Sequence, residues 1–174
     1  MNSIKKMTII ALFSALIIIL TKIEIRFAEY HFHLGNVMCL LCGFFLSPLS
    51  AGFSAGLGSM LYDILFYPNG IFILTTFVNK FFMSFVTSSI KNKVINNEKK
   101  ITLIISGIIG EIVYIVLYMG KTFFERYYFY SLKIQAIIPI MIEKLMSSVT
   151  NAIIAIVLSV IIYNSIKNII KEYL

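Results

Sequence analysis

The chain has 174 residues, of which 59% are hydrophobic and only 13% are charged, and its mean hydropathy is +0.92. This composition excludes a soluble domain and predicts an integral membrane protein. A chain of this length has room for about five to seven spans of roughly 20 apolar residues each and for no extramembrane domain. The formal net charge of +7 is attributed to cytoplasmic loops that face anionic lipid, and no nucleic-acid partner is predicted.

Six apolar segments follow one another along the chain. The first, from Met7 to about Thr21, follows two lysines but has no small-residue cleavage site after it, so it predicts a retained helix rather than a signal peptide. Turn-forming residues separate later segments, above all Ser47-Pro48 and Tyr67-Pro68-Asn69-Gly70. The other five segments are residues 34–46, 49–66, 71–90, 101–120 and 134–163.

The connecting segments differ in character. Residues 22–33 are charged and bulky and are expected to form a loop, as are the polar residues 91–100. Residues 121–133 combine charged residues with tyrosine and phenylalanine, which suits a segment lying along the membrane interface.

The lysine and arginine residues predict the orientation. Six spans place both termini on one side of the membrane. That side carries eight lysines, whereas the other side carries five basic residues, Lys22, Arg26, Lys121, Arg126 and Lys133. Under the positive-inside rule this difference favours cytoplasmic termini. We therefore expect an all-α fold, a single transmembrane domain over residues 1–174 with six helices, N-in and C-in. If the short segment 34–46 is re-entrant, the count becomes five and the topology changes.

Cys39 and Cys42 form a C-x-x-C spacing inside an apolar segment, near His31 and His33. This spacing suits a zinc or redox site, but no second cysteine pair follows. Two thiols packed within a helix are the favoured interpretation. No metal and no cofactor is predicted.

Five ionisable residues fall inside the predicted spans: Asp63, Lys80, Glu111, Glu143 and Lys144. A charge at the bilayer centre costs at least about 2.5–3.5 kcal/mol on insertion scales, so each is expected to face a partner or a cavity. One explanation is that these charges pair only to neutralise the helices. The favoured explanation is a ligand site or an ion pathway.

Polar residues recur at helical spacing in three of the predicted spans. Each set falls on one helix face, and three such faces in a small bundle predict a common polar interior. The sets are Thr76, Lys80, Ser84 and Thr87; Glu111, Tyr114 and Tyr118; and Lys144, Ser147, Ser148 and Asn151.

Pairs of small residues four positions apart let helix backbones approach closely. Gly52 and Gly56 are expected to pack inside the bundle, whereas Ala11 and Ala15 suit either internal packing or a groove that receives a separate membrane subunit. There is no phosphate-binding loop, no Ser/His/Asp arrangement and no H-E-x-x-H motif, so no catalytic residue and no enzyme activity is predicted. Uphill transport would need a partner or a coupled ion.

Over nearly its whole length the chain resembles the substrate-binding S components of energy-coupling factor (ECF) vitamin transporters. It is most similar to the riboflavin-transporter-like branch, which includes predicted carriers of the hydroxymethylpyrimidine precursor of thiamine. One departure is Ser47, where relatives commonly have glycine. The matching motifs are Ala11-x-x-x-Ala15, His33-Leu34-Gly35-Asn36, Pro48-x-x-x-Gly52, Gly58-x-x-x-x-Asp63, the Lys80 helix, Gly110-Glu111-x-x-Tyr114 and the stretch from Lys144 to Asn151.

The resemblance implies a protein of a bacterial plasma membrane that binds a small vitamin or vitamin precursor from outside. It implies docking through Ala11 and Ala15 onto a transmembrane coupling subunit carried by two cytoplasmic ATPases, with ATP-driven release of the ligand inside. It also implies a site near the outer face, built from the loop after the first helix and from the fourth to sixth helices. The candidate substrate-binding residues are Lys80, Glu111, Tyr114 and Asn151, followed by Tyr118, Lys144 and Asn36.

Each candidate is assigned a role. Tyr114 is expected to stack on a ring, Glu111 to accept hydrogen bonds, and Lys80 either to donate to the ligand or to neutralise Glu111. The alternative function is a self-contained ion-coupled carrier or channel in which Asp63, Lys80 and Glu111 form a relay. An intramembrane enzyme is the least favoured class.

Overall fold

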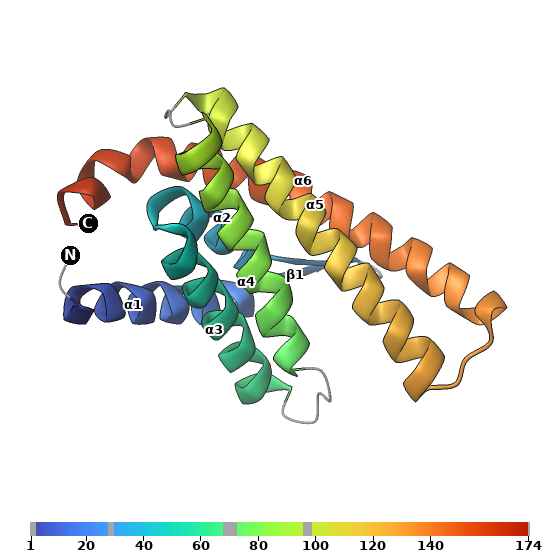
Figure 1. The fold of residues 1–174 in the computed structure, drawn as a ribbon. Helices are drawn as coiled ribbons and strands as arrows, with labels where there is room; N and C mark the ends of the chain where they lie inside the picture. Colours follow the sequence, from blue (N-terminus) through green and yellow to red (C-terminus); the bar gives the residue numbers. More distant parts are fainter. Residues whose placement is uncertain (1–2, 28–29, 68–72, 96–98, 174) are drawn as a thin grey trace.

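The computed structural model describes residues 3–27, 30–67, 73–95 and 99–173. These residues form a helical bundle with one short β-hairpin (Figure 1). Two π-helical turns, η1 (Ile90–Ile95) and η2 (Glu125–Phe129), continue α4 and α5. The helices are α1 (Ser3–Lys22), α2 (Gly35–Phe45), α3 (Pro48–Phe66), α4 (Ile73–Ser89), α5 (Lys100–Phe124) and α6 (Ile134–Tyr173).

The predicted helical membrane bundle is confirmed in its main features. Five helical segments of the described chain are long and apolar enough to cross a membrane, whereas α2 has only 11 residues. A sixth span therefore stays a prediction. The start of α1 and the end of α6 lie on the same side of the molecule in Figure 1, opposite the α5–α6 turn. The cytoplasmic location of that side also stays a prediction.

The short helix α2 forms the centre of the bundle. It packs against each of the other five helices, and all of its residues are buried except Phe45. Because a helix leaves its last carbonyl groups without intrahelical partners, a buried helix end needs donors from elsewhere. Lys91 Nζ donates to the Phe44 carbonyl at 2.6 Å, and Ser88 Oγ donates to the Leu46 carbonyl at 2.6 Å. Side chains of α4 and η1 thus complete the end of α2.

Small residues allow α3 to approach both of its neighbours. A Cβ atom at Gly58 would lie 2.7 Å from the Ser14 carbonyl oxygen of α1, and Ser14 Oγ donates to the Ser54 carbonyl at 3.0 Å. On the opposite side, Gly52 and Gly56 face phenylalanine rings of α4. The Gly52/Gly56 pair therefore packs inside the bundle, as predicted.

Two segments differ from their predicted form. Residues 121–129 continue the helix of α5 through η2, beyond the predicted end of the fifth apolar segment, because no proline or glycine interrupts them and a helix need not end where hydropathy falls. The place of this segment at the membrane interface stays a prediction. Similarly, α6 continues to Tyr173 and is about 60 Å long at 1.5 Å per residue. It is therefore longer than a bilayer core.

The segment after α1 contains a hairpin rather than only a loop. Strands β1 (Glu24–Phe27) and β2 (Tyr30–His33) pair antiparallel, with Glu24 opposite His33. Charged residues alternate with apolar ones in β1, and aromatic residues alternate with histidine in β2, which is the period-two pattern of a strand. The hairpin brings His33 to the start of α2, where the candidate site lies.

Candidate functional site

Two neighbouring cavities lie where the hairpin meets the helices. The α3–α4 cavity has a volume of about 260 Å³, and the α5–α6 cavity has a volume of about 180 Å³. His33, Tyr114 and Tyr118 line both. The α3–α4 cavity is also lined by Thr21, Gly35, Ser59, Tyr62, Asp63, Tyr67, Thr76 and Lys80. The α5–α6 cavity is also lined by Asn36, Glu143, Lys144, Ser147, Ser148 and Asn151.

The structure brings all seven predicted substrate-binding residues to this region. Lys80 lines the α3–α4 cavity, while Asn36, Lys144 and Asn151 line the α5–α6 cavity. The two tyrosines line both cavities, and Glu111 contacts Asn36 without being a lining residue of either cavity. The three consecutive helices α4, α5 and α6 thus present their polar faces to one place. Ligand binding by these residues stays a prediction.

A buried polar network joins α2, α4 and α5. Lys80 Nζ donates to Asn36 Oδ1, and Asn36 Nδ2 lies 3.2 and 3.3 Å from the two carboxylate oxygens of Glu111. Asn36 and Glu111 are each 2% exposed and Lys80 is 6% exposed. The Asn36 amide therefore bridges two opposite charges that have little access to solvent. Removing either charge would leave the other buried and unpaired, which typically costs about 3–5 kcal/mol.

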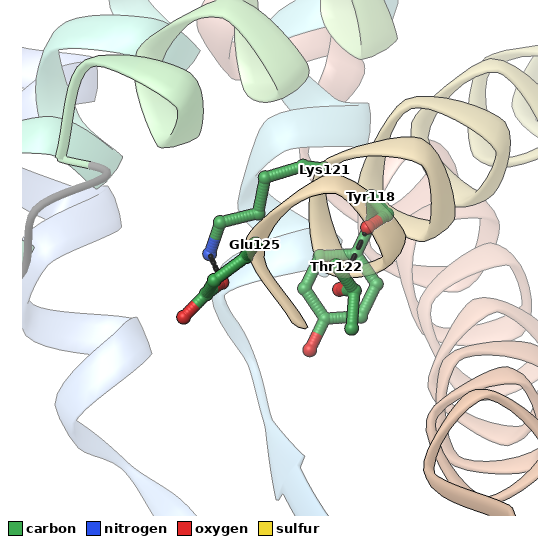
Figure 2. A network of polar contacts seen from close by, with 4 residues as sticks. All are labelled: Tyr118, Lys121, Thr122 and Glu125. Atoms are coloured by element: carbon green, nitrogen blue, oxygen red, sulfur yellow. Dashed lines mark hydrogen bonds and ion pairs between the residues drawn. The ribbon is translucent and has the colours of Figure 1, made fainter. Parts of the chain in front are cut away.

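The two tyrosines of α5 that line the cavities stack on each other, and Lys80 contacts one of them. The rings of Tyr114 and Tyr118 stack with centroids 5.8 Å apart and planes inclined by 17°, and Lys80 Nζ lies 3.7 Å from the centroid of the Tyr114 ring. One turn further on, Thr122 Oγ1 donates to the Tyr118 carbonyl at 2.8 Å (Figure 2). The cation at Lys80 thus orients the Tyr114 ring, which lines both cavities.

Several lining residues were absent from the predicted site. His33 was considered only beside the cysteine pair and in a motif, and Asp63 only in a motif and in the alternative ion relay; neither was among the predicted substrate-binding residues. Ser59 and Asp63 are four residues apart on α3 and line the same cavity, so the helical spacing that identified the other polar faces could have found them. Tyr62 and Tyr67 carried no comparable signal because aromatic residues are frequent throughout this chain.

The cysteines and the other metal-ligand types do not form a cluster. Cys39 and Cys42 are buried free thiols of α2, and Cys39 Sγ lies 3.9 Å from Ser59 Oγ. Within the described ranges, no three His, Cys, Asp or Glu side chains lie close enough together to hold a metal ion. Both thiols are packed inside the bundle, while the side chain of His31 lies outside what the structure describes.

The alanine pair of α1 faces away from the bundle. Ala11 and Ala15 are both exposed, whereas Phe13, Ser14 and Ile17 of the same helix are buried against the interior. Helix α1 therefore uses one face for internal packing and leaves the small-residue face open. Internal packing, which was one of the two roles considered for this pair, is excluded by that exposure.

Comparisons with known proteins agree with each other. The family model for the S component of ECF-type riboflavin transporters matches residues 1–168. A solved structure described as the S component of a bacterial ECF transporter has the same fold, with a TM-score of 0.76 and 19% sequence identity. The alignment covers 98% of this chain and 99% of the other. Among curated protein sequences, none matches significantly.

Proposed function

Because this chain belongs to the family of ECF-type riboflavin transporter S components, we propose that it is the substrate-binding subunit of an ECF-type importer in a bacterial cell membrane. It captures a small vitamin or vitamin precursor outside. It delivers the ligand inward when docked on a transmembrane coupling subunit with two cytoplasmic ATPases. The observation that carries this proposal is the convergence of polar faces from α4, α5 and α6 on two cavities beside a buried charged network.

The lining residues suit a flat heteroaromatic ligand. The ring of Tyr114 offers a stacking surface, which is typically worth about 0.5–1.5 kcal/mol beyond the area it buries. Lys80 has N–H donors beyond the one that Asn36 accepts, and Asn151 supplies an amide with donors and an acceptor. The Asn36 amide is itself held between Lys80 and Glu111 and positions Lys80 at the cavity. Each cavity alone is small, but together their volumes fall within the range of roughly 300–1,000 Å³ that is usual for ligand pockets.

The exposed alanine groove supports docking through α1. A groove of small residues lets a partner helix approach its backbone closely, and such contacts drive helix association in lipid. Ala11 and Ala15 offer that groove on the outer surface of the bundle. We assign this face to the coupling subunit.

The charge distribution supports cytoplasmic termini. Lysines at both ends of the chain and around the α4–α5 connection outnumber the basic residues near the hairpin and the α5–α6 turn. With this orientation the two cavities face the outside, where the ligand arrives.

The test is the identification of small molecules that co-purify with the protein. We expect mass spectrometry to find a heteroaromatic vitamin or precursor in near-stoichiometric amount, and to find a smaller amount of it with a folded Tyr114→Ala variant. Proteoliposomes that contain this chain alone provide the contrary outcome. If they accumulate a solute on an ion gradient without ATPases, the chain is a self-contained carrier and the proposal fails.

A further inference from the structure

A further cavity, the turn cavity, lies between η2 and the start of α6, at the end of the molecule away from both termini (Figure 1). It is lined by residues 127–128 and 131–135. Its volume of about 600 Å³ exceeds that of either cavity beside the hairpin, and it shares no lining residue with them. A backbone hydrogen bond from the Leu132 N–H to the Arg126 carbonyl, 3.1 Å long, closes the turn. The turn cavity is therefore a separate feature of the fold.

The polar residues of the turn cavity suit an anion. Lys133 supplies an exposed ammonium group. Tyr128, Ser131 and Gln135 supply N–H and O–H donors around it. The described lining residues include no carboxylate, and the nearby Glu125 is already paired with a lysine one turn before it. An anionic group in this cavity therefore gains attraction from Lys133 without repulsion from the lining.

An apolar face of α6 continues from the turn cavity along the helix. Ile134, Ile138, Ile142 and Leu145 recur at helical spacing and are between 43% and 54% exposed. From the first to the last of them the face is about 16 Å long at 1.5 Å per residue. This length is close to half of the roughly 30 Å hydrocarbon core of a bilayer. The face therefore matches one acyl chain within one leaflet.

The tyrosines place the turn cavity at the level of the lipid headgroups. Tyr127 and Tyr128 line it and are 42% and 63% exposed. Their rings have an apolar body and a polar hydroxyl, and such rings gather where hydrocarbon meets headgroups. The cavity and the apolar face adjoin at Ile134, which belongs to both. The two together fit a molecule that joins an anionic group to an apolar chain, which a free phosphate ion does not.

From this arrangement we propose that the turn cavity binds the headgroup of one anionic phospholipid, with an acyl chain along the apolar face of α6. Lys133 contacts the phosphate, and the surrounding hydroxyl and amide donors contact other headgroup oxygens. The lipid belongs to the leaflet in which α5 ends and α6 begins. This inference is independent of the imported ligand, because the turn cavity shares no residue with the cavities beside the hairpin.

Fluorescence quenching tests the proposal on the full chain in proteoliposomes. The chain has no tryptophan, so a single introduced tryptophan reports only the lipids next to it. Ile138→Trp places this fluorophore on the apolar face of α6. Val78→Trp is the matched control, since Val78 is also exposed and lies at a similar distance from the start of α4, which runs in the same direction as α6 (Figure 1).

The measured quantity is quenching by brominated phosphatidylglycerol relative to brominated phosphatidylcholine. One lysine near an anionic headgroup should make the Ile138→Trp position prefer phosphatidylglycerol about fivefold. The Val78→Trp position should show no preference. Equal preferences at the two positions, including none at either, overturn the proposal.

Lysine variants in the Ile138→Trp background locate the source of the preference. Lys133→Gln should reduce it to the level of the control position. Lys100→Gln removes an exposed lysine at the start of α5, on the opposite side of the membrane, and should leave the preference unchanged. A preference that survives Lys133→Gln, or that both variants lower equally, overturns the role of Lys133 and with it the proposal.

A competition experiment separates a lipid from a free anion. Inorganic phosphate should lower the phosphatidylglycerol preference no more than chloride does at the same ionic strength, because the acyl chain also holds the lipid. A larger loss with phosphate would assign the turn cavity to a free anion and overturn the proposal.

Native mass spectrometry provides a measurement without any tryptophan variant. From micelles that contain equal amounts of the two lipids, the unmodified chain should carry more phosphatidylglycerol than phosphatidylcholine, and Lys133→Gln should remove the excess. Equal amounts of both lipids on the unmodified chain, or an excess that Lys133→Gln retains, overturn the proposal.

Discussion

The charge pair that Asn36 bridges allows one prediction to be worked through in detail. Lys80→Met leaves Glu111 buried without a cation, and Glu111→Gln leaves Lys80 buried without an anion, with each side chain at most 6% exposed. Each single change should cost about 3–5 kcal/mol, which corresponds to a loss of roughly 6–20 °C in Tm for a chain of this size. The double variant removes both charges, so its Tm should lie above that of either single variant.

The protein contains a built-in probe for this measurement. Cys39 and Cys42 are both 0% exposed, so a thiol-reactive fluorogenic dye reports their exposure as the bundle unfolds on heating. Ligand affinity should not recover in the double variant, because Lys80 lines the α3–α4 cavity and Asn36 loses the groups that orient it. Recovery of both Tm and affinity would assign Lys80 a purely neutralising role.

A second ion pair provides the matched control. Lys121 and Glu125 lie 3.3 Å apart on successive turns of the helix, with side chains that are 24% and 17% exposed (Figure 2). Such a partly solvated pair is worth about 0.3–0.5 kcal/mol, so Lys121→Met and Glu125→Gln should each change Tm by roughly 1–2 °C. The reasoning is refuted if the losses from the two Lys80/Glu111 single variants simply add in the double variant. It is equally refuted if Lys121→Met or Glu125→Gln lowers Tm as much as Lys80→Met or Glu111→Gln does.

Three further predictions follow from the surface and the cavities. Ala15→Trp should abolish ATP-driven uptake in cells while leaving ligand binding to the purified protein intact, because a bulky side chain fills the exposed groove of α1. The control is Val116→Trp, at a lipid-facing position that is 64% exposed, which should leave uptake unchanged. Uptake at the wild-type rate by Ala15→Trp would contradict the docking role of the groove. Cysteine at Lys99 should resist impermeant thiol reagents in intact cells whereas cysteine at Tyr127 should react, and equal labelling would contradict the N-in, C-in orientation. Tyr114→Ala should weaken ligand binding by roughly 2–13-fold through lost stacking, whereas Tyr114→Phe should bind nearly as the wild type does; equal losses in titration calorimetry would place the hydroxyl, not the ring, at the ligand.

Local pattern in the sequence was sufficient to locate the helices and to predict which of their faces are polar. Hydropathy located the long apolar segments, and Ser47-Pro48 marked the break between α2 and α3 because proline is favoured in the first turn of a helix. The spacing of polar residues on α4, α5 and α6 identified side chains that do meet around the two cavities. The alternation in β1 and β2 was also present in the sequence, but a charged segment after a span was interpreted as a loop.

Only the tertiary structure decided how those faces combine. Helical spacing specifies which residues share a face, but it does not specify the rotation of that face or the helix opposite it. The contact between Asn36 and Glu111 joins residues 75 positions apart, and it exists because α2 is packed at the centre of the bundle. That burial also explains why so short and apolar a segment could not be assigned from hydropathy, since a core helix and a membrane span of similar composition differ only in what surrounds them.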